Sequence, residues 1–185
     1  MDIVVAFAAL VLLSPLFLAV AVLVKLDSPG SILFRQERLG KNGSVFRILK
    51  FRTMVKDADQ MRIPVEQVRK WEAERSDPRV TRVGKWLRRT GIDEFPQLLN
   101  ILKGDISLVG PRPYYLRRMD SDPGLKERLS VKPGFVSLAL VRGGVHLSEE
   151  EIKKYDQEYM EKQSLWLDIA ILLKAVYLLL SGKGF

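Results

Sequence analysis

The residues best suited to chemistry are two adjacent carboxylates, Asp93 and Glu94, which follow a strongly basic segment. Residues 79–89 carry five Lys or Arg side chains and no acidic side chain. Cations beside carboxylates suit work on phosphorylated substrates, because the cations and a metal neutralise phosphate charge while a carboxylate acts as nucleophile. Adjacent helical residues point about 100° apart, so we expect the two carboxylates to have different roles. The alternative is that Asp93, or Thr90 before it, only caps a helix.

A second candidate is Arg112, which stands between Pro111 and Pro113. Each proline fixes its own φ angle and restricts the residue before it, so the loop is largely ordered in advance. A rigidly presented guanidinium is suited to bidentate recognition of phosphate. The alternative is a rigid turn with a solvated arginine.

The segment that must position the two carboxylates has the pattern of a short helix. Apolar residues recur at helical spacing from position 95 to position 102, and Gly104 is a stop signal. Pro96 is tolerated only near a helix start, where the first N–H groups lack intrahelical partners. The helix is therefore predicted to begin close to Ile92 or Asp93, with both carboxylates at its positive N-terminal end.

The N-terminal segment predicts a membrane helix. Residues Ile3 to Val24 form an uncharged run of 22 residues, and about 20 suffice to span a bilayer. Ser14 and Pro15 lie near its middle, where proline kinks or breaks a helix. From these residues alone, a kinked spanning helix and a re-entrant helix that returns to the same side both remain open. In either case the basic body is expected in the cytoplasm.

Further elements are predicted around this core. Apolar residues near positions 32–34 and 45–48 suggest strands of a hairpin, with a turn at 39–43. Residues 165–180 form a second apolar run, with Trp166 and Tyr177 near its ends. Aromatic residues so placed favour a helix at the membrane interface, and a buried core helix is the alternative.

Composition limits the available chemistry. The 185 residues include 30 Lys and Arg against 22 Asp and Glu, for a net charge of +8, with no cysteine and one histidine. Thiol catalysis, disulfides and zinc fingers are therefore excluded, as is a cluster of histidine ligands. The positive charge indicates an anionic partner: a nucleic acid, a phosphorylated substrate or an anionic membrane face.

Several sequence blocks, in this order, resemble the bacterial sugar transferases, the small monotopic phosphoglycosyl transferases. The resemblance covers nearly the whole chain and is highly specific. The blocks are Ser28-Pro29-Gly30, Phe34-Arg35-Gln36, Arg38-Leu39-Gly40, Lys50-Phe51-Arg52-Thr53-Met54, Thr81-Arg82-Val83-Gly84, Leu87-Arg88-Arg89-Thr90, Asp93-Glu94-Phe95-Pro96-Gln97-Leu98-Leu99-Asn100, Lys103-Gly104-Asp105 and Ser107-Leu108-Val109-Gly110-Pro111-Arg112-Pro113.

The resemblance implies an enzyme that transfers a phosphosugar from a UDP-sugar to undecaprenyl phosphate and releases UMP. Members of the family use Mg²⁺ and start the assembly of surface glycans on the cytoplasmic face of the bacterial inner membrane. It also implies that residues 1–26 form a re-entrant helix, broken at Ser14 and Pro15, that enters one leaflet. The expected fold is α+β and mostly helical, with a catalytic domain at 27–185 that includes an interfacial helix at 165–181. No nucleic acid is expected as a partner, and a homodimer is left open.

The resemblance also assigns roles to residues. Asp93 is implied to be the nucleophile that forms a covalent phosphosugar intermediate and to contact Mg²⁺, while Glu94 is implied to act in acid/base chemistry or positioning. Pro111, Arg112 and Pro113 are implied to hold the nucleotide phosphates. The implied ligands of the diphosphate or the lipid phosphate are Lys50, Arg52 and Arg88.

The chain departs from the family pattern at residues 133–144, which lack the usual Thr, second Gly and Gln, so the sequence does not predict the sugar. Two other functions remain as alternatives. One is a membrane-tethered protein that binds nucleic acid or another anion through Arg82, Lys85 and Arg89. The other is a catalytically degenerate scaffold that binds polyprenyl phosphate.

Overall fold

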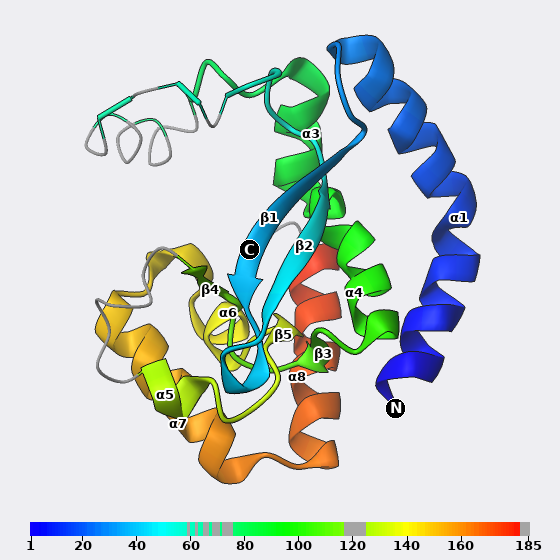
Figure 1. The fold of residues 1–185 in the computed structure, drawn as a ribbon. Helices are drawn as coiled ribbons and strands as arrows, with labels where there is room; N and C mark the ends of the chain where they lie inside the picture. The colour runs from blue at the N-terminus through cyan, green and yellow to red at the C-terminus, as the bar shows by residue number, and fades with distance from the viewer. Residues whose placement is uncertain are drawn as a thin grey trace. The chain divides into compact units, whose positions relative to one another are not determined.

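The computed structural model is a mostly helical α+β structure with one long apolar helix and two small sheets (Figure 1). It describes residues 1–58, 60, 61, 63, 64, 67, 71, 76–116 and 125–181. Contacts divide the chain into two units, each treated by itself below. Unit 1 comprises Met1–Leu12, Arg35–Leu49 and Pro96–Phe185, and unit 2 comprises Leu13–Phe34 and Lys50–Phe95.

Helix α1 spans Asp2–Asp27 and is the one helix, among the described residues, that is long and apolar enough to cross a membrane. Its 26 residues correspond to roughly 39 Å at 1.5 Å per residue, against a hydrocarbon core of about 30 Å. Large apolar side chains along it remain exposed, including Val4 at 74%, Leu12 at 80% and Leu26 at 79%. A helix with this much apolar surface needs a nonpolar environment, which agrees with the predicted membrane segment.

The predicted interruption of this helix at Ser14 and Pro15 is corrected by the structure. Helix α1 continues through both residues, with Pro15 inside it. The physical reason is that one proline removes a single backbone donor, so a helix bends at it and continues. The boundary between the two units falls beside this point, between Leu12 and Leu13. The re-entrant path remains a prediction.

The predicted hairpin is confirmed. Strand β1 (Leu33–Leu39) is followed by the 3₁₀ turn η1 (Lys41–Gly43) and strand β2 (Val45–Phe51). Asn42 has a φ of 56°, a left-handed conformation that asparagine tolerates well. Strand β4 (Tyr114–Tyr115) pairs antiparallel with β1 and completes the sheet order β2-β1-β4.

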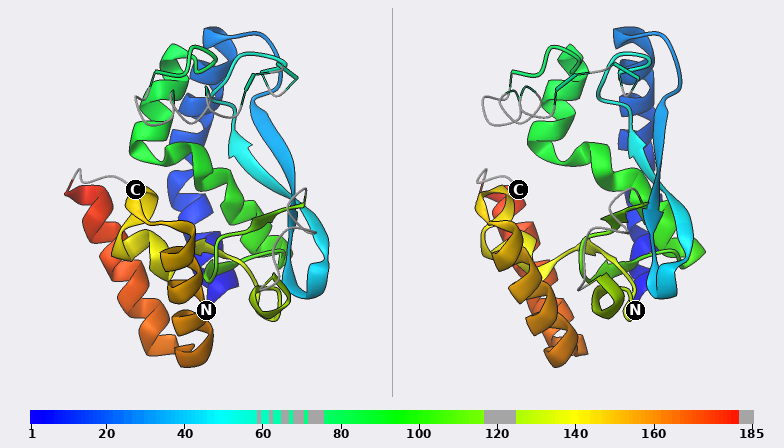
Figure 2. Two further views of the ribbon diagram at one scale, coloured as in Figure 1. Left: turned by 90° about the vertical axis from the view of Figure 1, so that its left-hand side faces the viewer. Right: turned by 60° about the vertical axis from the view of Figure 1, so that its left-hand side comes forward.

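The remaining elements follow in chain order. They are α3 (Arg82–Thr90), η2 (Ile92–Gln97), α4 (Leu98–Lys103), β3 (Ser107–Val109), α5 (Leu125–Arg128), β5 (Gly134–Val136), α6 (Leu138–Arg142), η4 (Gly144–His146), α7 (Glu149–Lys162) and α8 (Leu165–Leu180). Strand β3 pairs with β5 in parallel, and α6 packs against both α7 and α8 (Figure 2).

Helix α8 is buried on one side only. Ile171 and Ala175 are buried, whereas Trp166 is 80% exposed and Tyr177 63% exposed. The Tyr159 hydroxyl of α7 donates to the Asp168 carboxylate of α8 at 2.8 Å, which ties the two helices together. The fully buried alternative is therefore excluded. The apolar outer face is compatible with the predicted interfacial position, which stays a prediction.

The core of unit 2 joins the C-terminal half of α1 to the end of β2 and to α3. Val20, Val24, Phe51 and Leu87 are buried together, and the Phe17 ring meets the Phe51 ring edge-on at 5.7 Å. Burying each such side chain contributes about 1.5–3 kcal/mol. This cluster fixes the elements that carry the candidate site.

Candidate active site

Asp93 and Glu94 lie in the 3₁₀ helix η2, and α4 begins only at Leu98. The predicted helix start close to Ile92, with both carboxylates at its N-terminal end, is confirmed, but the first turns are 3₁₀ and not α-helical. Pro96 has no N–H to give to an α-helical ladder, and Gly91 ends α3 in a left-handed conformation with φ of 71°. The tighter 3₁₀ geometry takes the chain directly from one short helix to the next.

Asp93 is a buried carboxylate, with 9% of its surface exposed. Burial raises its pKa above the ordinary value, and the adjacent Glu94 carboxylate raises it further. The positive charges of Lys50 and Arg88 act in the opposite direction and lower the pKa. Asp93 is thus a poorly hydrated carboxylate between one negative and two positive side chains. This is a suitable environment for a group that attacks an anionic phosphate.

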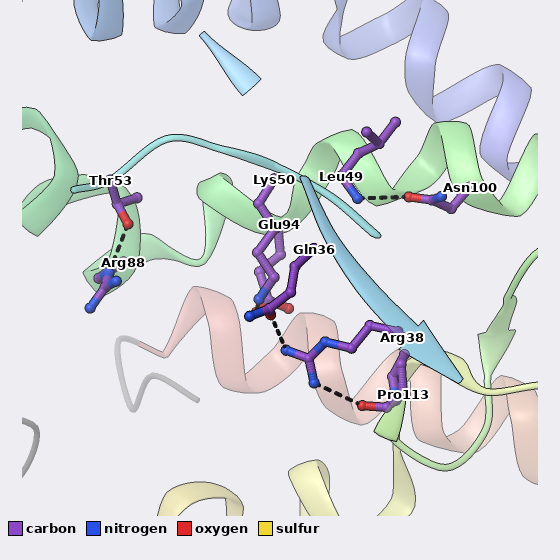
Figure 3. Close-up of polar contacts among 9 residues, drawn as sticks. All are labelled: Gln36, Arg38, Leu49, Lys50, Thr53, Arg88, Glu94, Asn100 and Pro113. Atoms are coloured by element: carbon purple, nitrogen blue, oxygen red, sulfur yellow. Dashed lines mark hydrogen bonds and ion pairs between the residues drawn. The ribbon is translucent and has the colours of Figure 1, made fainter. Parts of the chain in front are cut away.

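Glu94 forms an ion pair with Lys50. The Lys50 Nζ donates to Glu94 Oε1 at 2.5 Å, and the two side chains are 19% and 30% exposed (Figure 3). Partial burial makes this charge-assisted hydrogen bond stronger than a surface ion pair. Lys50, near the end of β2, and Glu94, in η2, come from segments 44 residues apart, and their ion pair holds them beside Asp93.

The Arg88 side chain is exposed, but a hydrogen bond fixes its position. Its Nε donates to the Thr53 hydroxyl at 2.9 Å, which fixes the base of the guanidinium group (Figure 3). The Thr53 carbonyl accepts from the Thr81 N–H at 3.0 Å, so the start of α3 is attached to the chain after β2. A Cβ on Gly84 would overlap the Thr53 carbonyl, so only glycine lets α3 approach this closely.

Gly84→Ala is expected to destabilise the protein, although alanine is the better helix former. The added methyl group must push α3 away from the backbone at Thr53, and overpacking of this kind costs about 1–3 kcal/mol. The thermal midpoint in detergent measures the effect. Lys85→Ala, at an exposed position of the same helix, is the matched control. A Gly84→Ala protein as stable as the native one would show that the contact is not tight.

Arg52, which was predicted as a phosphate ligand, is bound to the end of α1. Its side chain is buried, and its Nη2 donates to the Ser28 carbonyl at 2.6 Å, the Ser28 hydroxyl at 3.0 Å and the Val24 carbonyl at 3.3 Å. These acceptors include the last turn of α1, whose carbonyls lack intrahelical partners. Arg52 therefore positions the end of α1 and the turn after it. Its predicted phosphate contact, like those of Lys50 and Arg88, stays a prediction.

The loop of Arg112 belongs to unit 1. Arg112 is exposed between two buried prolines, as its predicted rigid presentation requires. The Pro113 carbonyl accepts from Arg38 Nη1 at 3.1 Å (Figure 3). The Pro111 carbonyl accepts from the Gly134 N–H at 2.8 Å. Both ends of the loop are thus pinned by buried groups. Its contact with the nucleotide phosphates stays a prediction.

The carboxylates at this site suit a divalent cation only when a substrate supplies further ligands. Among the described residues no group of three or more Asp, Glu or His side chains could hold a metal ion. Asp93 and Glu94 offer two adjacent carboxylates, and Glu94 already binds Lys50. Mg²⁺ is commonly bound by one or two carboxylates together with substrate phosphates and water. The residues present therefore fit a metal that arrives with a phosphorylated substrate.

The sequence did not predict the residues that support the site. Thr53 and Gly84 stand only within the blocks that resemble the family, and nothing near Arg38 in the sequence indicates that it donates to the Pro113 carbonyl. Asn100 was missed as well: its side chain accepts from the Leu49 N–H at 3.0 Å and donates to the Arg47 carbonyl at 2.8 Å. A lone polar residue in an apolar helix was the one available signal for Asn100.

The sequence matches one family of proteins. The model of the bacterial sugar transferase family matches residues 1–182. The chain belongs to this family, as the motifs around Asp93 and Arg112 predicted.

Characterised relatives extend the comparison. The chain is 43% identical over 194 residues to the UDP-glucose:undecaprenyl-phosphate glucose-1-phosphate transferase of Caulobacter vibrioides, covering 98% of this chain and 68% of that protein. It is 41% identical over 191 residues to the UDP-N-acetylgalactosamine-undecaprenyl-phosphate N-acetylgalactosaminephosphotransferase of Aeromonas hydrophila, covering 100% of this chain and 44% of that protein. The exopolysaccharide production protein ExoY of Rhizobium meliloti is 37% identical, with 99% and 85% covered. The chain thus spans less than half of the Aeromonas protein but most of the other two.

Proposed function

We propose that this protein is a phosphoglycosyl transferase that moves a sugar 1-phosphate from a UDP-sugar to undecaprenyl phosphate and releases UMP. The observation that carries the proposal is the buried Asp93 carboxylate beside the Lys50–Glu94 ion pair and the anchored Arg88. Family membership and the names of the relatives support the substrates. The apolar helix α1 suits an enzyme whose acceptor is a membrane lipid.

In the first step, a carboxylate oxygen of Asp93 attacks the β-phosphorus of the UDP-sugar. The bond from this phosphorus to the bridging oxygen breaks, and UMP leaves with the electron pair. Asp93 then carries the phosphosugar as an acyl phosphate. Burial removes hydrating water from the Asp93 carboxylate, while the charges of Lys50 and Arg88 favour approach of the diphosphate.

In the second step, a phosphate oxygen of the lipid attacks the same phosphorus, and the Asp93 carboxylate is released unchanged. Glu94 holds Lys50 in place for both steps through their ion pair. Mg²⁺ supplies charge neutralisation on the diphosphate when bound, with Asp93 and Glu94 as its protein ligands. Arg112 binds the nucleotide phosphates from its rigid loop.

The proposal includes a location. Helix α1 enters one leaflet of the bacterial inner membrane and, as a continuous helix bent at Pro15, returns to the same side. The outer face of α8 lies on the membrane surface. The catalytic residues then face the cytoplasm, where UDP-sugars are made. Aromatic residues at the exposed face of α8, Trp166 and Tyr177, support this placement.

The experiment that tests the function identifies the released nucleotide. Detergent-solubilised protein is mixed with Mg²⁺, undecaprenyl phosphate and a panel of UDP-sugars that includes UDP-glucose and UDP-N-acetylgalactosamine. The panel is needed because relatives of similar identity are named for different sugars. UMP is the expected product, with one donor preferred.

Other products would reject the proposal in distinct ways. UDP in place of UMP would mean transfer of the sugar without its phosphate. No nucleotide across the panel, from folded protein that still binds undecaprenyl phosphate, would favour the catalytically degenerate scaffold.

A further inference from the structure

The outward face of α3 is a stripe of three cations and a tryptophan. Arg82, Lys85, Trp86 and Arg89 follow the spacing i, i+3, i+4, i+7, which places them on one side of a helix. All four side chains are exposed, Trp86 by 45%. Helix α3 contains no acidic residue, and among the described residues none of the three cations has an ion-pair partner.

The opposite face of α3 packs against the rest of unit 2. Leu87 is fully buried, and Val83 packs against the same cluster as Val20 and Val24 of α1. Gly84 lies against the backbone at Thr53. Because the inner face is held in this way, the helix cannot rotate to hide its basic stripe. The stripe is a fixed external surface of unit 2.

The position of α3 relates this surface to the membrane helix. The Val83 N–H donates to the carboxylate of Asp27, the last residue of α1, at 2.9 Å. Helix α3 therefore starts where α1 ends, and the two lie side by side (Figures 1 and 2). Because α3 is attached to the last residue of α1 and packs against its last turns, α3 lies near the level where the chain would leave the hydrocarbon.

We propose that this stripe is a docking surface for anionic phospholipid headgroups. The three cations bind lipid phosphates, and Trp86 lies at the headgroup level, where amphipathic rings are favoured. Charge complementarity and the attachment to the end of α1 both point to the bilayer surface. The inference rests on the membrane location given under the proposed function, but not on the transfer reaction.

Nucleic acid is the competing partner for a basic stripe. The stripe is only two turns long, and it belongs to a helix that is attached to the end of the apolar helix α1. A membrane surface satisfies the cations and Trp86 together, whereas a nucleic acid would leave the neighbouring apolar surface of α1 unaccounted for. The bilayer is therefore the favoured partner.

The test is lipid-selective quenching of Trp86 fluorescence. The full chain with Trp71→Phe and Trp166→Phe, which leaves Trp86 as the one tryptophan, is reconstituted in phosphatidylcholine nanodiscs. These nanodiscs contain a minor fraction of lipid spin-labelled near the glycerol, either phosphatidylglycerol or phosphatidylcholine. Each basic side chain near an anionic surface contributes roughly a fivefold preference. We expect quenching by the labelled phosphatidylglycerol to be at least about fivefold more efficient, and to weaken at high salt.

Matched variants show whether the three cations of the stripe cause the preference for phosphatidylglycerol. The triple change Arg82→Gln, Lys85→Gln and Arg89→Gln is expected to make the two labels equally effective. Arg82→Lys with Arg89→Lys, which keeps the charge, should retain the preference. The control triple replaces three exposed lysines of unit 1 by Gln and should also retain it; these are Lys41, Lys103 and Lys154.

Three results would overturn the proposal. The first is equal quenching by both labels in the protein with the native stripe. The second is an equal loss of preference in the control triple, which would show attraction by net charge alone. The third is a shift of Trp86 emission by RNA that abolishes quenching, which would assign the stripe to nucleic acid. Since none of these readouts uses catalysis, failure of the phosphosugar transfer would leave the lipid result distinguishable.

Discussion

Asp93→Asn is expected to reduce UMP release by roughly 10⁴-fold or more, because it removes the attacking oxygen while keeping the shape of the side chain. The measurement is UMP formation at saturating UDP-sugar. Asp57→Asn is the matched control, since Asp57 is exposed and has a φ of 59°, which asparagine tolerates. Substantial UMP release by the Asp93→Asn protein would remove Asp93 from the role of nucleophile.

The same substitution is expected to raise the thermal stability of the protein near neutral pH. Burial raises the pKa of Asp93 in the folded state, so the ionised carboxylate is disfavoured there relative to the unfolded chain. The contribution of this group to stability is complete below its unfolded pKa and is lost as pH rises through its folded pKa. Asparagine cannot ionise, so its advantage should vanish at acid pH. An inactive protein that is also more stable is typical of a functional site.

Lys50→Met is expected to lower the rate of UMP release by about 10²–10³-fold, as removal of one preorganised cation does in other enzymes. The loss has two sources: the diphosphate loses a cation, and Glu94 loses its ion-pair partner. Because the charge of Lys50 lowers the pKa of Asp93, its removal should also raise that pKa. The acid limb of the pH–rate profile should therefore move to higher pH.

Two variants separate these effects from a general loss of charge. Lys50→Arg keeps the cation and should restore most of the pH profile, though its larger head group will fit the Glu94 site less well. Lys56→Met removes an exposed lysine close by and should leave rate and profile unchanged. A Lys50→Met enzyme with an unshifted acid limb would contradict the assignment of that limb to Asp93.

The elements that the sequence predicted well are those governed by local rules. The β1–β2 hairpin follows from two apolar segments around a glycine-containing turn, and Asn42 supplies the left-handed residue. The end of helix α4 was predicted from Gly104 alone, and this glycine has a φ of 81° in the structure. Each of these depends on neighbours in the chain, which the sequence displays directly.

The parts that could not be predicted depend on contacts between distant segments. Nothing near Arg52 in the sequence indicates that its guanidinium caps α1 through Ser28, 24 residues away. The approach of Gly84 to Thr53 and the bond from Thr53 to Arg88 are of the same kind. The 3₁₀ geometry at Asp93 was missed for another reason: Pro96 is compatible with the start of an α-helix and with a 3₁₀ turn. The motifs predicted the family, while the contacts of each cation depend on tertiary packing that the sequence does not display.

The most direct test of the central claim is to trap the phosphosugar on the protein. The full chain is incubated with its UDP-sugar and Mg²⁺ without undecaprenyl phosphate, quenched, and analysed by intact mass and peptide mapping. The account predicts a mass increase of one phosphosugar, located on Asp93, that is lost on addition of the lipid and absent from the Asp93→Asn protein. An enzyme that turns over without any such adduct, or that carries it on another residue, would contradict the two-step mechanism.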